Sequence, residues 1–558
     1  MTALRFAILL CLCFPAPLMG AEIREIPIGM DGAGAILKAR VAEDAFTDQG
    51  LRQRIVLIGP SSREWQQACA AVCEEWELRP GARGTTAGKI SLSAVFVSPA
   101  LLESPAATFP PTGTFYSDKA QVEAQYLWRW LSQFGPDLVI IVQGGKGEQL
   151  LVPDVRLPQF EALRAKSANS PPAASLARAL ADGQAIETGA IPAVVLETSP
   201  EHLSQQVRSV LRAVSTIPSP ARSELERRRQ RSAVELTEEL SQTYGKNLDS
   251  VVYIPAVALM ARVRLGAQQG ETKTLRDVER IVAPYVEKQK PSLPEKPSSS
   301  HLSGHLIFAE LAKATNDARY VNKVREAADL GFDGQGRPLE AMPFHTEMSD
   351  SVFMGCPILA AAGRLTGERK YYGMMLRHLR FMQKLCLRED GLYRHSPLDE
   401  AAWGRGNGFP ALGLALCLEY LPAEAAERAE VQRAFQAHMQ ALIPYQDASG
   451  MWHQVVDHPE SYREFSCTCM ITYAMARGFA RAGWTVRRMP PLSRVLGPRF
   501  ASESAHRVRL WISARGRANS EVCRTISTAR RFWGRDDRGG AMAMLVATKW
   551  PSTKADSG

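Results

Sequence analysis

The pattern of apolar and polar positions changes character near residue 215. Before that point, short β-branched apolar runs alternate with amphipathic stretches of helical period. The runs cover residues 54–59, 91–97, 137–142 and 193–196, and helical patterns such as residues 64–77 and 120–134 lie between them. Alternation of this kind predicts a mainly parallel sheet covered by helices, with sites at the carboxyl ends of its strands. We therefore expect an N-terminal α/β domain over residues 21–215.

A charged break follows this domain. Pro218 and Pro220 lead into residues 223–231, which are mostly Glu and Arg. Proline and a run of charge are typical of a connecting segment, either extended or an exposed helix. We assign residues 216–231 to a linker.

From residue 232 to residue 548 the apolar residues recur with a helical period. The segments TNDARY (315–320) and TGERKY (366–371) share one pattern, 51 residues apart, and each separates two helical stretches. A helix–turn–helix unit repeated at this spacing predicts an array of about six hairpins. The array could remain an open solenoid, but its polar, aromatic-rich loops favour closure into an (α/α)6 toroid with a cleft. The chain is thus predicted to be multidomain, with an all-α second part.

Two loop clusters of the helical half combine acidic and histidine side chains. Residues 342–356 contain His345 and Asp350, and the turn DGLYRH (390–395) ends in His395. Ser349 or Asp350 could simply cap the helix that begins here, which is the ordinary role of such residues.

Two further clusters carry tryptophan. In WGRGNGF (403–409), Trp403, Arg405 and Asn407 alternate with glycines, and a stacking indole beside a guanidinium fork suits a sugar carboxylate. Residues 450–457 contain Trp452 and are followed by Glu464. This last cluster is equally consistent with a connecting turn that buries Trp452.

Residues 1–20 are typical of a secretory signal peptide. Arg5 precedes the apolar run 7–14, and small residues near Gly20 suit cleavage, although a buried N-terminal helix is an alternative. We expect export to a periplasm or beyond, with no membrane partner after cleavage, because no later apolar stretch is long enough to span a bilayer. Residues 549–558 are assigned to a tail.

The remaining cysteines form no ligand framework. Eight cysteines lie beyond residue 20, without paired CxxC spacing, and several stand in apolar helical runs. There cysteine behaves as a small hydrophobe. We interpret them as packing residues and predict no metal site and no cofactor.

The net charge of +9 comes from one block. Residues 485–535 contain twelve Arg, no Lys and two Glu, so the rest of the chain is close to neutral. Nucleic-acid-binding proteins usually spread basic groups over a face, so a nucleic acid is a poor candidate partner. The block interrupts the helical period, which raises the hypothesis that this stretch is translated in a shifted reading frame.

The helical half resembles a known enzyme group. SDSVFMGCP (349–357), DGLYRH, WGRGNGF, YQDASGMWHQVVD (445–457) and GRDDRGGAMAM (534–544) occur in the order found in unsaturated glucuronyl and rhamnogalacturonyl hydrolases, glycoside hydrolase families 88 and 105. The resemblance implies a six-hairpin toroid. It also implies removal of a 4,5-unsaturated uronic acid from the non-reducing end of lyase-generated oligosaccharides, by hydration of the double bond.

The resemblance also implies roles for single residues. Asp350 matches the catalytic acid/base, with Phe353 and Met354 expected to raise its pKa by apolar surroundings. The positions that match substrate contacts are His395, Trp403 and Arg405. Asn407 is a further candidate for substrate binding and is also expected to hold their loop. His345 and Trp452 are further candidates for sugar contact.

The sequence differs from each of two resembled families at one expected site. Many family members carry a further cleft aspartate where this chain has residues 298–305, which contain no acid, so His301 could take its place. The N-terminal domain resembles zinc carboxypeptidase-like proteins through FPPTGTFYSD (109–118) and EAQYLWRW (123–130), but it has no HxxE pair. We therefore expect a binding or spacer domain without a metal centre.

Two other functions remain open from the sequence. The chain could be a carbohydrate-binding or scaffold protein whose catalytic toroid has decayed, which the missing acid and the Arg-rich block would explain. It could also be another (α/α)6 glycosidase that pairs Asp350 with Glu464 or Asp457 as two carboxylates. The expected partner of the first hypothesis is an unsaturated uronyl oligosaccharide.

Overall fold

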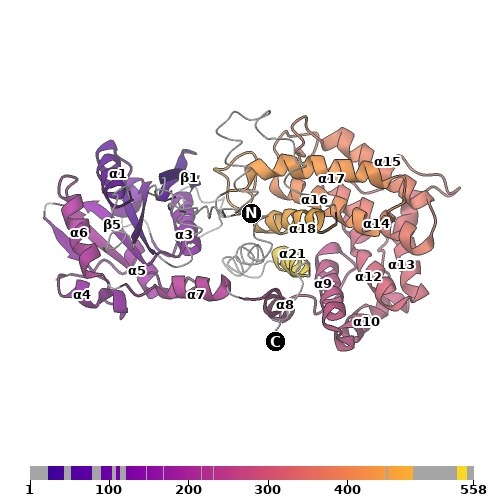
Figure 1. The fold of residues 1–558 in the computed structure, drawn as a ribbon, viewed down its shortest axis with the longest axis horizontal. Coiled ribbons are helices and arrows are strands. Elements are labelled where there is room, and N and C mark those ends of the chain that lie inside the picture. Colours follow the sequence, from indigo (N-terminus) through magenta and orange to yellow (C-terminus); the bar gives the residue numbers. More distant parts are fainter. Residues whose placement is uncertain are drawn as a thin grey trace, which may run out of the picture. The chain divides into compact units, whose positions relative to one another are not determined.

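The computed structural model forms two compact units, residues 1–222 and 223–558, described separately below (Figure 1). It describes residues 23–42, 52–77, 90–103, 108–112, 121–145, 147–167, 169–214, 216–229, 231–447, 450–481 and 537–548. The expected signal peptide, the Arg-rich block and the tail lie outside these residues. Within the described part, no helix has the length and apolar character to cross a membrane.

The first unit is built on a seven-stranded mixed sheet of order β1-β2-β4-β3-β5-β7-β6. Its strands are β1 (Ile23–Met30), β2 (Ile36–Ala42), β3 (Gln53–Pro60), β4 (Ile90–Val97), β5 (Leu138–Gly144), β6 (Gln149–Leu151) and β7 (Ala193–Thr198). The four predicted strands are β3, β4, β5 and β7, and they pair in parallel. The sequence analysis missed β1, β2 and β6, which pair antiparallel at the two edges and make the sheet mixed.

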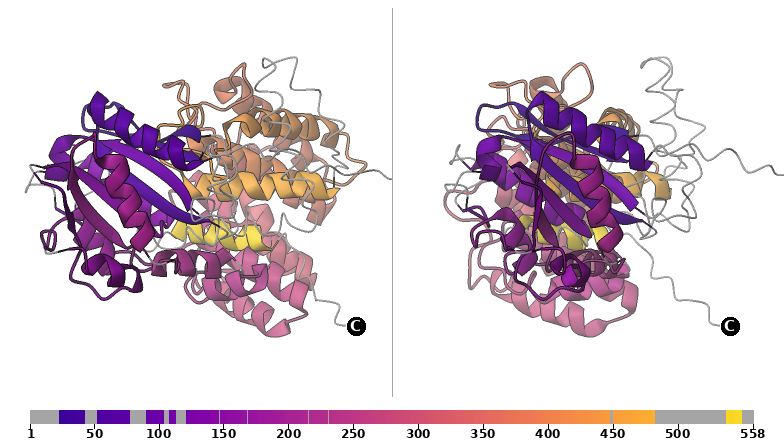
Figure 2. Two further views of the ribbon diagram at one scale, coloured as in Figure 1. Left: turned by 60° about the vertical axis from the view of Figure 1, so that its left-hand side comes forward. Right: turned by 90° about the vertical axis from the view of Figure 1, so that its left-hand side faces the viewer.

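Helices cover this sheet, which explains the unbroken apolar runs of its central strands. Helices α1 (Arg63–Glu77) and α6 (Leu203–Ala213) pack together on one face. Helix α3 (Val122–Phe134) packs against β1, and α5 (Leu176–Asp182) against β7. Short helices α2 (Pro99–Glu103) and α4 (Glu161–Arg164) complete the unit, and Figure 2 shows its strands side by side.

The segment expected to be a linker is partly built into the first unit. Residues 220–229 form α7 (Pro220–Arg229). Buried Asp137 accepts backbone hydrogen bonds from Arg54 and Ser219, both at 2.9 Å. Ser219 and Arg222 are themselves buried. The start of this segment is therefore packed rather than solvated.

The second unit consists of helical hairpins, as the repeat predicts. The inner helices are α9 (Tyr253–Gln269), α11 (Ser299–Gly304) continuing into α12 (Leu306–Thr315), α14 (Ser351–Thr366), α16 (Gly404–Tyr420), α18 (Phe465–Arg481) and α21 (Asp537–Ala547). The outer helices among the described residues are α8 (Ala233–Ser241), α10 (Thr272–Val286), α13 (Ala318–Ala328), α15 (Lys370–Cys386) and α17 (Arg428–Leu442). Residues 482–536, between α18 and α21, lie outside the described part.

The inner helices close into a ring. Each packs on its successor, from α9 through α12, α14, α16 and α18 to α21, and α21 packs on α9 (Figure 1). The toroid is therefore closed within the described residues, and the open solenoid is excluded. One continuous apolar core fills the space between the inner and outer helices.

The repeated TNDARY and TGERKY segments form equivalent turns. Asn316 and Gly367 each end an inner helix in the left-handed conformation, with φ of 58° and 76°. The hydroxyls of Thr315 and Thr366 donate to the carbonyl four residues earlier, at 2.8 and 2.7 Å. Glycine and asparagine favour this conformation, so the same local chemistry turns the chain from inner to outer helix in both hairpins.

The seven cysteines within the described residues are all buried. This agrees with their interpretation as packing residues. No group of three or more His, Cys, Asp or Glu side chains in the described part of the chain is arranged to hold a metal ion.

A buried network of charges joins four inner helices toward their C-terminal ends. Arg264 of α9 pairs with Glu310 of α12 and, at 3.1 Å, with Glu419 of α16. Arg477 of α18 lies 3.3 Å from Glu419. Burial opposes the charge of Glu310, but Arg264 outweighs burial and holds the pKa of this carboxyl below its ordinary value.

We expect Arg264→Met to destabilise the helical unit by about 3–5 kcal/mol, because it leaves the buried Glu310 carboxylate without its cationic partner. The matched control is Arg380→Met, which breaks the exposed pair of Arg380 with Glu430 and should cost about 1 kcal/mol or less. Urea unfolding of the full chain, followed by far-UV circular dichroism, measures both. Equal effects of the two substitutions would contradict a stabilising role for the network.

Candidate active site

Three segments at the N-terminal ends of α14, α16 and α18 bring the candidate residues together. Asp350 immediately precedes α14, and its Oδ1 lies 3.7 Å from Nε2 of His395. The His395 ring meets the Trp403 ring edge to face, with centroids 4.4 Å apart. The Arg405 guanidinium lies over the Trp403 ring, 4.2 Å from its centroid. Four of the predicted residues thus form one cluster.

The helix-capping alternative for Asp350 does not hold. Asp350 occupies the N-cap position of α14, but its side chain makes no capping hydrogen bond. The Ser349 hydroxyl instead donates to the carbonyl of Gly406 at 2.8 Å. The Asp350 carboxyl is 21% exposed and lies beside His395. Neither side chain is therefore explained by capping.

His395 is a neutral neighbour of Asp350 at pH 7. Burial lowers the pKa of its imidazole, and the positive charge of Arg405 lowers it further. A neutral imidazole offers Asp350 a polar contact without the Coulomb attraction that would favour a carboxylate over a carboxylic acid.

Arg405 is oriented by an aromatic face and by a carboxylate. Besides stacking on Trp403, it pairs with Glu464 through an Nη1–Oε1 contact of 3.4 Å. Glu464 in turn accepts hydrogen bonds from the Ser466 hydroxyl and the Cys467 backbone N–H in the first turn of α18. The Arg405 side chain is 24% exposed, so it is open to contact with a ligand.

The glycines of WGRGNGF serve close packing at the start of α16 rather than a free loop. A Cβ on Gly404 would stand 2.5 Å from the carbonyl oxygen of His453, and one on Gly406 would stand 2.9 Å from the Ser349 hydroxyl. The backbone N–H of Gly404 donates to the carbonyl of Gln454 at 2.6 Å. Trp403 and Arg405 are therefore held against the segment that precedes α18.

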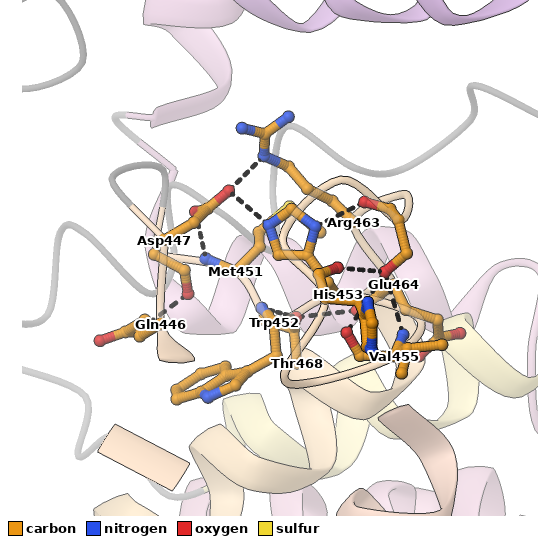
Figure 3. A network of polar contacts seen from close by, with 12 residues as sticks. Gln446, Asp447, Met451, Trp452, His453, Val455, Arg463, Glu464 and Thr468 are labelled. Atoms are coloured by element: carbon orange, nitrogen blue, oxygen red, sulfur yellow. Dashed lines mark hydrogen bonds and ion pairs between the residues drawn. The ribbon is translucent and has the colours of Figure 1, made fainter. Parts of the chain in front are cut away.

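A polar network stabilises that segment (Figure 3). His453 Nε2 lies 3.3 Å from Asp447 Oδ2, and Arg463 pairs with the same carboxylate. His453 Nδ1 contacts the carbonyl of Ser461 at 2.6 Å. The Glu464 backbone N–H donates to the Trp452 carbonyl at 2.9 Å. The network thus fixes the backbone that positions Glu464 and supports Trp403.

The structure contradicts direct ligand contact by two predicted residues. Trp452 is 1% exposed, and its indole N–H donates to the Leu442 carbonyl at 2.8 Å, so it is a core residue. Asn407 is fully buried; its side chain bonds to both backbone groups of Tyr393 and to the Trp403 carbonyl. Asn407 therefore holds the turn that leads to His395, and it is too deep to touch a sugar.

His345 lies in the same loop as Asp350 but contacts other groups. Its ring meets Phe381, and its Nδ1 accepts the Glu347 backbone N–H at 3.0 Å. Phe353 and Met354, expected to surround Asp350, face the core: Phe353 stacks on Phe409, and the Met354 sulfur accepts the Ser303 hydroxyl.

His301 starts α11. Its Nδ1 accepts the Ser298 backbone N–H at 3.1 Å, and its Nε2 lies 3.5 Å from the Ser250 hydroxyl. No described contact links it to Asp350.

The two carboxylates of the glycosidase alternative are engaged elsewhere. Glu464 pairs with Arg405 and binds the first turn of α18, and it is only 8% exposed. Asp457 pairs with Arg388 at 2.9 Å. Sequence reasoning treated Glu464 as a possible second catalytic acid and missed its role in orienting Arg405, because that contact joins residues 59 positions apart.

Comparison with known proteins gives matches to the helical half. Residues 227–489 match the family model described as Glycosyl Hydrolase Family 88. The chain is 26% identical over 193 residues to the unsaturated rhamnogalacturonyl hydrolase YesR of Bacillus subtilis, covering 31% of this chain and 55% of that protein. It is 28% identical over 149 residues to the unsaturated 3S-rhamnoglycuronyl hydrolase of Formosa agariphila, covering 23% and 39%. The chain thus spans about half the length or less of these curated relatives.

Among solved structures, a glycosyl hydrolase family 88 protein from Bacteroides vulgatus is 16% identical to this chain. The alignment covers 57% of this chain and 99% of that one, with a TM-score of 0.42.

We expect Gly404→Ala to destabilise the protein by about 1–3 kcal/mol, because the added methyl group would overlap the His453 carbonyl and the backbone cannot easily yield. The matched control is Gly373→Ala on the exposed side of α15, where nothing lies within 4 Å of the new Cβ. That substitution should stabilise by about 0.5–1 kcal/mol. Thermal unfolding reports both, and a stabilised Gly404→Ala protein would refute the close approach.

Proposed function

We propose that the glycosyl hydrolase family 88 domain, which residues 227–489 form, hydrolyses oligosaccharides that end in a 4,5-unsaturated uronic acid. The observation that carries this proposal is the cluster of a partly exposed carboxyl, a neutral imidazole and a stacked guanidinium in Asp350, His395 and Arg405. The names of the curated relatives, both unsaturated glycuronide hydrolases, support the same substrate class.

The chemistry that we propose needs one carboxylic acid. Asp350, protonated at rest, gives its proton to C4 of the C4–C5 double bond, and the positive charge that develops at C5 is shared with the ring oxygen. A water molecule adds to C5 while the Asp350 carboxylate takes up its proton, which restores the acid. The resulting hemiketal opens to a ketone at C5 and a hemiacetal at C1. Collapse of this hemiacetal releases the remaining sugar as an alcohol, so one water is consumed.

The neighbours of Asp350 supply binding and orientation. Arg405 can bind the uronate carboxylate as a planar fork, with its charge partly balanced by Glu464. The Trp403 ring is covered on one face by the Arg405 guanidinium and packs edge to face with the His395 ring. Trp403 therefore orients these two groups. His395 lies close enough to Asp350 to contact the same sugar ring.

The single-acid scheme is favoured over a two-carboxylate glycosidase by the surroundings of the other acids. Glu464 and Asp457 both pair with arginines. A general base that activates water needs access to that water, which Glu464 lacks because it is buried and paired, while the Asp457 carboxylate is engaged by Arg388. We also propose that residues 1–20 direct export, which N-terminal sequencing of the mature protein tests.

We expect Asp350→Asn to lower kcat by about 10²–10⁴-fold, since the amide cannot donate the required proton. Loss of the absorbance of the conjugated double bond of a lyase-generated disaccharide measures turnover. Glu347→Gln is the matched control, because it neutralises an exposed carboxylate of the same loop and should leave kcat unchanged. Full activity of Asp350→Asn would exclude the mechanism, and binding without turnover by the unaltered protein would favour a carbohydrate-binding role.

We expect Arg405→Lys to raise KM about tenfold, because a lysine loses one charge-assisted hydrogen bond of the fork and the stacking on Trp403. With the C6 methyl ester of the same disaccharide, the substitution should have little effect, since no carboxylate remains to be bound. Arg377→Lys, at an exposed position of α15, is the control. An equal loss on acid and ester would show that Arg405 does not bind the carboxylate.

A further inference from the structure

A buried histidine of the outer helix α15 contacts both ends of the loop that carries Asp350. His378 is fully buried. Its Nδ1 accepts the backbone N–H of Met342 at 3.2 Å, and its Nε2 donates to the carbonyl of Ser351 at 3.0 Å. Met342 and Ser351 stand on either side of residues 343–350, so one imidazole ring joins the start of this loop to the first turn of α14.

The two hydrogen-bond partners of His378 determine which of its ring nitrogens carries the proton. Because Nδ1 accepts from an N–H, the proton must sit on Nε2, where it meets the Ser351 carbonyl. Burial lowers the pKa of His378 to about 4, so the ring is neutral over the physiological range. Both nitrogens are therefore used for structure, and neither is left for proton transfer.

The loop between the two contacts is conformationally strained. Phe344, Thr346 and Glu347 have φ of 65°, 47° and 56°, which is the left-handed region that non-glycine residues rarely adopt. Such a conformation persists only where surrounding contacts hold it. The backbone N–H of Ser349 donates to the carbonyl of His395 at 2.9 Å, which ties the end of the loop to the neighbouring turn.

Space for the imidazole is provided by a glycine in α14. A Cβ on Gly355 would stand 2.6 Å from His378 Nε2. Gly355 follows Ser351 by one helical turn, so it lies beside the carbonyl that the ring binds. A glycine in a helix interior is unfavourable, and this close approach accounts for its presence.

A second buried histidine contacts the loop and the inner helix of the next hairpin in a similar way. His438 of the outer helix α17 is buried, and its Nδ1 and Nε2 each lie 3.0 Å from a carbonyl oxygen, those of Gly391 and Asn407. Gly391 belongs to the turn that leads to His395, and Asn407 to the first turn of α16. His438 therefore joins the segments that carry His395, Trp403 and Arg405.

We propose that His378 is a positioning residue for Asp350, acting by fixing both ends of the 343–350 loop, while His438 positions the residues that bind the substrate. This inference rests on the proposed role of Asp350. The two histidines are placed alike on successive outer helices but serve different parts of the site, so they should affect different kinetic constants.

The first experiment compares kinetic constants of single variants that retain the far-UV circular dichroism spectrum of the unaltered protein. His378→Leu removes both contacts and should lower kcat by about 10–100-fold with KM changed less than threefold, because a small displacement of the acid impairs the chemical step. His378→Gln keeps an N–H for the Ser351 carbonyl and should recover part of kcat. His438→Leu should instead raise KM with a smaller loss of kcat.

The second experiment does not depend on enzymatic activity of the protein. The Met342 amide, bonded to His378 in the unaltered protein, should exchange its hydrogen faster in His378→Leu and in Gly355→Ala, but not in His438→Leu. Hydrogen exchange followed by mass spectrometry on peptides that cover residues 338–350 measures this.

The outcomes separate the two proposals. An unaltered protein without turnover, combined with the expected exchange pattern, overturns the proposed function but retains the bridge made by His378. Unchanged exchange of Met342 in both His378→Leu and Gly355→Ala overturns the bridge. Equal proportional changes of kcat and KM in the two leucine variants overturn the separate roles.

Discussion

The close contact between α14 and α16 sets the distance on which the candidate site depends. Gly413 of α16 faces the backbone of α14, and a Cβ there would stand 2.8 Å from Phe353 Cα and from the Val352 carbonyl. The Phe353 ring also stacks on Phe409, which lies one helical turn before Gly413, with ring centroids 5.5 Å apart. This packing brings the residue before α14, Asp350, next to the residues that begin α16.

The two ends of the helix ring have different physical characters. At the C-terminal ends, Arg264 and Arg477 pair with Glu310 and Glu419 against the core, and Glu310 and Arg477 are buried. At the N-terminal ends, Asp350, His395 and Arg405 retain partial exposure. One end thus contributes to the stability of the ring, and the other keeps polar groups available for chemistry.

Outer helices contribute to the site without reaching it. His378 and His438 extend inward from α15 and α17 and bind backbone groups of the loops that carry the polar side chains. Helices that form the outside of the ring therefore determine the conformation of loops on its inside. The strained residues Phe344, Thr346 and Glu347 lie where such support is needed.

Most of the fold and the identity of the main site residues could be predicted from local sequence patterns, but the burial of the site residues could not. The four parallel strands, the hairpin repeat and the positions of Asp350, His395, Trp403 and Arg405 are encoded in short segments, because periodicity, turn residues and motif order are properties of neighbouring residues. Strands β1, β2 and β6 were not predicted, because β1 and β2 mix charged residues and a proline with their apolar positions, and β6 has only three residues and pairs with the distant β7. Trp452 and Asn407 were assigned to the ligand because a sequence shows which groups are present but not which are buried.

The sequence favoured closure of the ring, but only the tertiary structure shows the packing of α21 on α9 that completes it. The pairing of Arg405 with Glu464 and the neutral state of His395 are likewise visible only in three dimensions, because they result from desolvation and from contacts between separate segments of the chain.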